Sequence, residues 1–251
     1  MKANCLKTLG AGILFGIQPA CNLALIPEGT MNALGAEAYV EATSPYREIV
    51  GTPEADMVRR IGERIAAASG RNYEWEFKLL DAPDTVNAFC LPGGKIAVYT
   101  GILPITQNED GLAVVMGHEV AHATAQHGNK RMTQGMGLEF GMNVASAFLS
   151  SSSNLSPEAH DGIMTAIGAG AQFGLVLPYG RDHESEADEI GLRFLVRAGY
   201  DPYEAPRLWE RMAQAFPERQ PEWMSTHPDP MRRAKELEAM IPRVLADERG
   251  R

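Results

Sequence analysis

The chain has 251 residues, of which 45% are apolar, and its formal net charge is −9 at pH 7. A chain of this size can bury the core of one full domain, while the acidic balance and the lack of a basic cluster exclude nucleic acid as an expected partner. Its three cysteines are too few for a disulfide framework. Nothing resembling a nucleophile signature surrounds Cys90, so we interpret this cysteine as a small buried hydrophobe.

The first 21 residues have the pattern of an export segment. Two lysines precede a short apolar stretch at residues 9–17, as in a secretory signal. Residues 18–21, Gln-Pro-Ala-Cys, resemble the boundary at which bacterial lipoproteins are cut and acylated, although Gln18 stands where an aliphatic residue is usual. Cleavage farther on, near Gly35, and an uncleaved anchor are the alternatives. We expect an exported protein, either in the periplasm or attached to the membrane through a lipidated Cys21.

Residues 22–45 show little regular pattern and are predicted to be a linker with some ordered contacts, so that residues 46–251 form one domain. Residues 54–69 have the pattern of an amphipathic helix that ends at Gly70. Three short strands are predicted to follow, at residues 74–80, 86–91 and 95–99. An exposed edge of this small sheet would be either an ordinary covered edge or a place where an extended peptide adds as a strand.

The next segment carries a motif that points to metal chemistry. Residues 118–122 read His-Glu-Val-Ala-His within an apolar run, and positions four apart return to nearly the same side of a helix. His118 and His122 can therefore hold one metal ion while Glu119 projects beside them. A catalytic zinc ion needs three protein ligands and an open position for water, whose pKa it lowers to about 7. The spacing predicts two zinc ligands and a general base. The alternative is a helix that displays solvated polar side chains, and the apolar flanks argue against it.

The third ligand is not in the same motif. A metzincin would continue with Gly at position 125 and His at position 128, where this chain has Ala125 and Gly128. His127 is expected to point to a different side of the helix. A second helix is predicted from about residue 181 to Gly199, with Glu184 and Asp188 on one face, one turn apart.

Two segments rich in small residues and Met, at 134–149 and 163–177, separate these two helices. Both are shorter than the roughly 18 apolar residues of a membrane-spanning helix, so we predict two closely packed helices joined by a loop. The hypothesis of a mobile lid over the site has residues 150–157 as its most flexible part. Further helices are predicted at 202–216 and 229–243.

Four ordered segments together resemble a known family. They are residues 87–101 (NAFCLPGGKIAVYTG), 117–122 (GHEVAH), Arg181 with 184–188 (ESEAD), and 225–233 (STHPDPMRR). The chain resembles the gluzincin zinc metallopeptidases of the CAAX prenyl endopeptidase and HtpX type, and within them the soluble envelope branch with BepA, LoiP and the mitochondrial Oma peptidase. The resemblance implies a mainly helical α+β, zincin-like fold with a small sheet before the helix of the His-Glu-x-x-His motif. One departure is Gly180, where such proteins often have Ser.

Carried over position by position, the resemblance assigns the residues of the site. His118, His122 and Glu184 would hold one Zn²⁺ per chain, Glu119 would be the general base, and Asp188 would orient a ligating imidazole. His227 would bind the oxyanion or close the metal site as a fourth ligand, and Arg233 would support the transition state or the ligands. The alternative for the last two is a helix start near Pro230 with Arg233 exposed.

These features predict an exported zinc metalloendopeptidase that cleaves misfolded or misassembled envelope proteins. Its partners would be protein or peptide substrates. The alternative is a chaperone-like envelope assembly factor in which zinc is structural and turnover is small. Glu119 discriminates between the two, because a closed structural site has no need of a carboxylate beside an open position.

Overall fold

The computed structural model describes residues 23–135, 180–216 and 230–250. The expected export segment, residues 1–21, lies outside the described residues. So do His227, the predicted lid loop at 150–157, and nearly all of the two segments rich in small residues.

A four-stranded sheet with the order β1-β2-β4-β3 lies at the centre of the fold. Its strands are β1 (Glu48–Ile49), β2 (Glu76–Leu80), β3 (Ala88–Leu91) and β4 (Lys95–Tyr99). β2 runs parallel to β4, whereas β1 and β3 are antiparallel to their neighbours. The three predicted strands are confirmed, and β1 is an addition. β3 lies at one edge of the sheet and β4 lies inside it.

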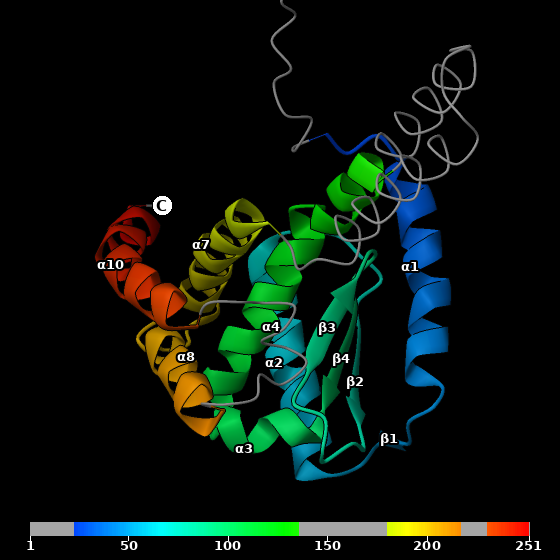
Figure 1. Cartoon of the computed structure of the whole chain (residues 1–251), viewed down its shortest axis with the longest axis horizontal. Coiled ribbons are helices and arrows are strands. Elements are labelled where there is room, and N and C mark those ends of the chain that lie inside the picture. Colours follow the sequence, from blue (N-terminus) through cyan, green and yellow to red (C-terminus); the bar gives the residue numbers. More distant parts are fainter. Residues whose placement is uncertain (1–22, 136–179, 217–229, 251) are drawn as a thin grey trace, which may run out of the picture.

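Helices cover both faces of the sheet. The side chains of β4 alternate between the two faces and therefore belong to two cores. Ile96 and Val98 pack with α2 (Pro53–Ser69) and α4 (Glu109–Thr124), while Ala97 packs on the opposite face with Tyr39 of α1 (Glu28–Thr43). Figure 1 shows α1 on one side of the sheet and α2 with α4 on the other. The hydroxyl of Tyr39 donates a hydrogen bond to the backbone oxygen of Ile96, which ties α1 to the central strand.

Residues 28–43, within the stretch interpreted as a linker with some ordered contacts, form the regular helix α1. Its buried positions are Met31, Gly35, Tyr39 and Thr43, which recur every four residues as on one face of a helix. Two of the four are Gly and Thr, so the buried stripe is not an apolar stripe in the sequence. Gly35 is needed there, because a Cβ at this position would lie 2.2 Å from the backbone oxygen of Pro92.

Further described helices follow in the chain. They are the short η1 (Thr100–Ile102) and α3 (Leu103–Thr106), a helix that begins at residue 127, and then α7 (Arg181–Ala198), α8 (Glu204–Ala215) and α10 (Pro230–Arg249). α7 packs along α4, and α10 packs against α7 and α8. The predicted inward side chains of α8, Leu208, Trp209 and Met212, are all buried. Within the described residues, no helix is both long and apolar enough to cross a membrane.

Two glycines let α4 and α7 approach each other closely. A Cβ on Gly191 would lie 3.1 Å from the carbonyl carbon of Gly117 and 3.1 Å from the backbone nitrogen of His118. Such a distance is shorter than carbon atoms normally keep in a packed interior. The backbones of the two helices are therefore nearly in contact one residue before the first histidine of the motif.

Candidate metal centre

The three predicted metal ligands converge between α4 and the first turn of α7. His118 and His122 lie one turn apart on the same face of α4, and Glu184 faces them from α7. Their exposed fractions are 3%, 2% and 1%. The close contact of the two helices at Gly117 and Gly191 sets the separation across which these side chains meet.

The spacing of the ligand atoms fits a tetrahedral ion. The Nε2 atoms of His118 and His122 are 3.0 Å apart, and they lie 3.5 Å and 3.4 Å from the two carboxylate oxygens of Glu184. Ligands placed about 2.0–2.1 Å from a tetrahedral zinc ion are separated from one another by about 3.3 Å. Two imidazoles and one carboxylate at these distances could therefore hold a metal ion.

Asp188 and Arg233 form a buried ion pair behind His118. The Nδ1 atom of His118 lies 3.1 Å from Oδ1 of Asp188, so this ring nitrogen faces the carboxylate while Nε2 faces the centre. Arg233 donates from Nε to Oδ2 of Asp188 over 2.8 Å, and from its two terminal nitrogens to Asp188 and Glu184. One guanidinium thus holds the carboxyl groups of both Glu184 and Asp188.

Helix α10 begins at Pro230, as the alternative for this segment expected, but Arg233 is wholly buried and not exposed. Its guanidinium carbon lies 3.7 Å from the centroid of the Trp209 ring, which stacks a cation on an aromatic face.

Although burial raises the pKa of Asp188, the charge of Arg233 and the hydrogen bonds from His118 and Arg233 lower it to about 2. Burial and Arg233 lower the pKa of His118, but hydrogen bonds to Asp188 and Glu184 outweigh them and raise it.

A histidine that the sequence analysis set aside lies directly behind His122. The Nδ1 atoms of His127 and His122 are 2.8 Å apart, and Nε2 of His127 lies 3.1 Å from Oε2 of Glu186. The expectation that His127 points away from the motif assumed an unbroken helix. Instead α4 ends at Thr124, Gln126 has a φ of 57°, and a new helix begins at His127. The spacing of five residues after His122 was the only signal available in the sequence.

Glu119 is buried beside the centre, with 4% of its surface exposed. Burial raises the pKa of the Cys90 thiol, and the charge of Glu119 raises it further. Helix α4, which carries Glu119, packs against β3, which carries Cys90. A thiol whose pKa is raised stays protonated, so Cys90 is not an activated nucleophile.

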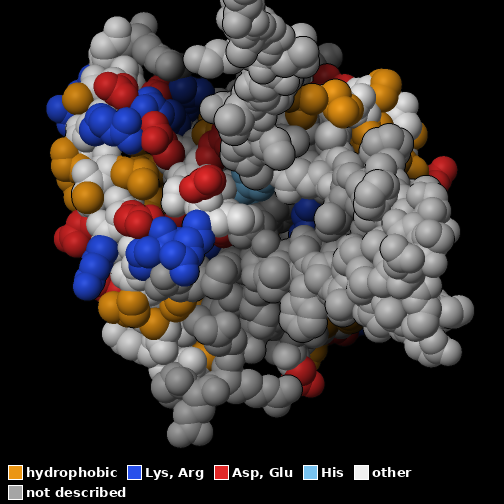
Figure 2. Space-filling model, turned by 45° about the horizontal axis from the view of Figure 1, so that its top comes forward, with side chains coloured by type: hydrophobic (Ala, Val, Ile, Leu, Met, Phe, Trp, Pro, Cys, Tyr) orange, Lys and Arg blue, Asp and Glu red, His pale blue; other side chains and the backbone are white. Residues whose placement is uncertain are grey.

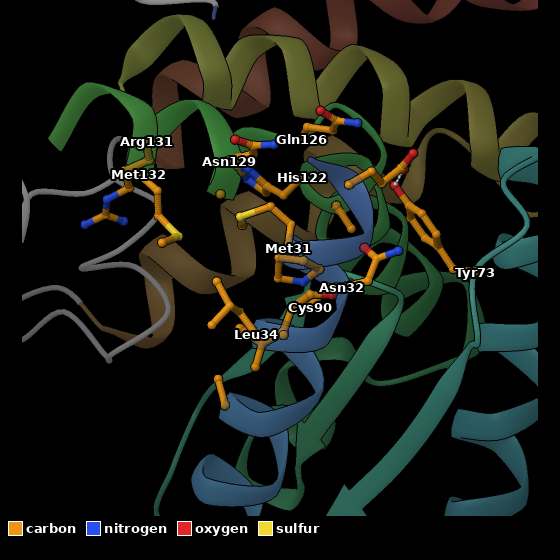
Figure 3. A pocket seen from close by; sticks show the side chains of 17 residues that line it. Met31, Asn32, Leu34, Tyr73, Cys90, His122, Gln126, Asn129, Arg131 and Met132 are labelled. Carbon is orange, nitrogen blue, oxygen red and sulfur yellow. Dashed lines mark hydrogen bonds between the residues drawn. The ribbon is translucent and has the colours of Figure 1, made fainter. Parts of the chain in front are cut away.

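A cavity opens beside His122. It has a volume of about 490 Å³ and lies between α1, the end of β3 and the chain that follows α4. Figure 3 shows Met31 and Leu34 of α1 on the same side of the cavity as Cys90, with His122 above Met31. Tyr73 donates a hydrogen bond of 2.9 Å to Glu28 near one end of the cavity. In Figure 2, a pale blue patch of histidine surface is visible near the centre of the view.

Comparison with known proteins identifies relatives of one kind. Residues 53–241 match the model of peptidase family M48. The mitochondrial metalloendopeptidase OMA1 of Schizosaccharomyces pombe is 36% identical over 215 residues, which cover 83% of this chain and 60% of that protein. The beta-barrel assembly-enhancing protease of Escherichia coli is 31% identical over an alignment that covers 98% of this chain and 55% of the relative. The OMA1 metalloendopeptidase of Saccharomyces cerevisiae is 33% identical over an alignment that covers 68% of this chain and 48% of that protein.

These relatives are longer proteins, since this chain spans 60% or less of the length of each of the three. The family match begins at residue 53 and therefore includes α2 through most of α10 but not α1. Both histidines of the motif, Glu184 and Arg233 lie within the matched part. Helix α1, which forms one wall of the cavity, precedes it.

Proposed function

Because this chain belongs to peptidase family M48, we propose that it is a zinc-dependent metalloendopeptidase that hydrolyses peptide bonds in misfolded or misassembled proteins of a bacterial envelope. The observation that carries this proposal is the convergence of His118, His122 and Glu184 at tetrahedral spacing, with Glu119 buried next to them. The names of the relatives, metalloendopeptidase and protease, agree with it.

His118, His122 and Glu184 would hold the metal ion. Two imidazoles with one carboxylate are a common ligand set for catalytic zinc, whereas Mg²⁺ and Ca²⁺ prefer oxygen ligands alone. Zinc bound at this position supplies Lewis acidity and lowers the pKa of water. Asp188 and Arg233 would act on the ligands, because both touch His118 or Glu184 and both are buried behind them.

Glu119 would act as the general base and general acid. It follows His118 directly on α4 and is buried, and from this position its carboxylate would accept a proton from the attacking water. The same carboxyl group would then deliver this proton to the leaving amine nitrogen. We also propose that His227 binds the oxyanion or acts as a fourth ligand, a role that rests on the sequence resemblance alone.

The substrate would lie along β3. The backbone nitrogen of Tyr99 donates to the oxygen of Asn87, so by the alternation of antiparallel pairs the backbone groups of Cys90 point away from β4. An extended peptide could add to this edge next to Glu119. The neighbouring cavity would receive a large apolar side chain of that peptide, because its walls are mostly apolar and His122 forms part of its lining.

We further propose that the protein is exported and works in the periplasm, either free or attached to the membrane through a lipidated Cys21. The basic start and apolar stretch of residues 1–21 support export. Mass spectrometry of the mature N-terminus distinguishes the forms, because acylation of Cys21 adds a defined mass, while cleavage farther on removes this residue.

The function is tested by Glu119→Gln, assayed for casein digestion and for zinc content. We expect cleavage to fall by at least about 1000-fold, because the variant cannot take a proton from water, while zinc content stays at one per chain. His122→Ala is the matched variant, and it should lose both zinc and cleavage. Retained cleavage in Glu119→Gln would contradict the mechanism. If instead the wild-type protein holds zinc and cleaves no peptide, the chaperone-like assembly factor with structural zinc becomes the better assignment.

A further inference from the structure

The break between α4 and the following helix brings an additional histidine to the metal centre. Ala125 and Gln126 form a turn in which the backbone of Gln126 is left-handed, and the helix that begins at His127 directs this side chain back toward His122. Gln has no special preference for this backbone conformation, so the surrounding packing must hold it there. The side chain of His127 has no exposed surface.

His122, His127 and Glu186 form a chain of side-chain contacts that leads away from the metal centre. Nδ1 of His122 faces Nδ1 of His127 at 2.8 Å, and Nε2 of His127 faces the Glu186 carboxylate at 3.1 Å. The ring of His183 stacks on the ring of His127 with the centroids 4.4 Å apart. Lys130 lies 3.6 Å from the same oxygen of Glu186. Two elements, α7 and the helix after α4, thus hold His127 in one orientation.

For a neutral His127, the order of donors and acceptors along this chain of contacts has one consistent solution. A carboxylate can only accept, so Nε2 of His127 carries its proton and donates to Glu186. Nδ1 of His127 is then an acceptor, and Nδ1 of His122 must carry the proton that it accepts. This leaves the lone pair of His122 on Nε2, the nitrogen that faces Glu184 and His118.

We propose that His127 and Glu186 are positioning residues that fix the ring orientation and tautomer of His122 for metal binding, which rests on the proposed metal centre at His118, His122 and Glu184. The two ligating histidines then have different supports. His118 contacts the buried carboxylate of Asp188 directly, whereas His122 reaches Glu186 through an intervening imidazole. The side chain of Glu186 is 43% exposed, so the support of His122 extends to the protein surface.

The first test is zinc affinity, measured on the full chain by competition with a chromogenic chelator. His127→Leu removes the acceptor behind His122 and should weaken zinc binding about 10- to 100-fold. His127→Asn can place its amide oxygen near the former Nδ1 position and should recover most of the affinity. A structural role that depends only on filling space would give the opposite order, because Leu is the more apolar replacement for a buried ring.

Substitution of Glu186 is an independent test of the proposal, because it changes a partly exposed side chain and not a buried one. Glu186→Ala should weaken zinc binding by several-fold, whereas Glu189→Ala, which removes a carboxylate of the same helix paired with Arg193 and Arg243, should leave it unchanged. If His127→Leu fails to fold, this pair of variants decides the matter. Equal zinc affinities in wild type, His127→Leu and Glu186→Ala would overturn the proposal.

The second test reads the tautomers directly. Long-range ¹H–¹⁵N correlation spectra of the zinc-loaded protein should show His122 protonated on Nδ1 and His127 protonated on Nε2, with the His127 signals assigned by their loss in His127→Asn. A spectrum in which His127 is protonated on Nδ1 would contradict the arrangement. These outcomes are separate from the failure of the proposed function, because a protein that binds zinc as described and cleaves nothing would refute the peptidase activity and leave the positioning pair intact.

Discussion

At the scale of single residues, the guanidinium of Arg233 is the group on which the buried charges of the centre depend. It contacts the carboxyl groups of Glu184 and Asp188 and stacks on Trp209, all without access to solvent. A buried ion pair contributes little net stability, because desolvation offsets the attraction. Its removal is costly, since it leaves unpaired charges in the interior. We therefore interpret Arg233 as a group that fixes positions more than one that adds stability.

The lowered pKa of Asp188 predicts how the stability of the metal-free protein depends on pH. Its pKa is about 2 in the folded state against about 3.9 in an unfolded chain, so the unfolded state binds more protons between these values. The contribution of Asp188 to the free energy of unfolding is present above about pH 4 and is lost as the pH falls toward 2. It amounts to about 2 kcal/mol.

Urea unfolding between pH 6 and pH 2.5, with a chelator present, measures this contribution. Asp188→Asn serves as the reference because it keeps the shape and cannot titrate. The wild type should lose more stability than the variant over this range. Parallel curves for the two proteins would show that Asp188 does not have the lowered pKa.

At the scale of secondary structure elements, the contact between α4 and α7 sets the geometry of the ligands. Gly191→Ala would add a Cβ 3.1 Å from the backbone of Gly117, so α7 has to move outward by a few tenths of an ångström. Alanine gains about 1 kcal/mol in helix propensity over glycine, which offsets part of the strain. We expect a small change in melting temperature and zinc binding weakened on the order of tenfold, because Glu184 moves away from the two histidines.

The matched control is Gly29→Ala in α1, where a Cβ meets no atom within 4 Å. This variant should be more stable by up to about 1 kcal/mol and should bind zinc as the wild type does. Isothermal titration of the three proteins, loaded from the metal-free state, measures the difference. Wild-type zinc affinity in Gly191→Ala would mean that the contact between the helices does not control the ligand spacing.

Helix α1 makes a separate prediction about cleavage preference. Leu34→Trp would fill part of the cavity beside His122, so bonds flanked by large apolar residues should be cleaved about tenfold more slowly relative to bonds flanked by small ones. Val40→Trp places the same side chain on α1 outside this cavity and should have no such effect. Mass spectrometric profiling of a peptide library measures the preference. An identical profile for wild type and Leu34→Trp would exclude the cavity as a subsite.

The sequence predicted those helices and strands whose pattern of residues is complete within one short stretch of the chain. Helix α2 has a regular apolar stripe and a terminal glycine, and the three predicted strands are separated by turn residues. Helix α1 was missed because Gly35 and Thr43 occupy buried positions. The two-residue strand β1 has too few residues for a period, and the order of strands depends on long-range pairing that no local pattern encodes.

The same distinction applies to the site. The spacing within the motif predicts that His118 and His122 share a face, whereas Glu184 and Arg233 could be named only by resemblance to a family. Both residues lie far from His118 in the sequence and come close to it only through tertiary packing. His127 was set aside because the end of α4 has no clear sequence signal, and the turn at Gln126 reverses its direction.

At the scale of the whole molecule, bound metal should determine much of the stability. The proposed ligands come from α4 and α7, so an ion that binds the folded chain at a concentration about 1000 times its dissociation constant would stabilise it by about 4 kcal/mol. For a domain of this size this corresponds to a rise in melting temperature of about 10 °C.

Differential scanning calorimetry with and without a chelator checks this expectation. The protein should melt at the lower temperature after metal removal and recover when zinc is restored. His122→Ala should melt at one temperature under both conditions. An unchanged melting temperature in the wild type would mean that the site does not hold zinc tightly.

The placement of Arg233 on the last described helix has a consequence for the order in which the protein is made. The histidines of α4 leave the ribosome more than a hundred residues before Arg233 does, so a growing chain contains the metal-binding motif long before the partner of its buried carboxylates. Until α10 docks, Asp188 and Glu184 lack that cation in the interior, and the ligands cannot keep their final positions. With the proposed function, an unfinished or truncated copy would therefore be inactive, and the cell would be protected from its activity until the segment that carries Arg233 has been made and docked.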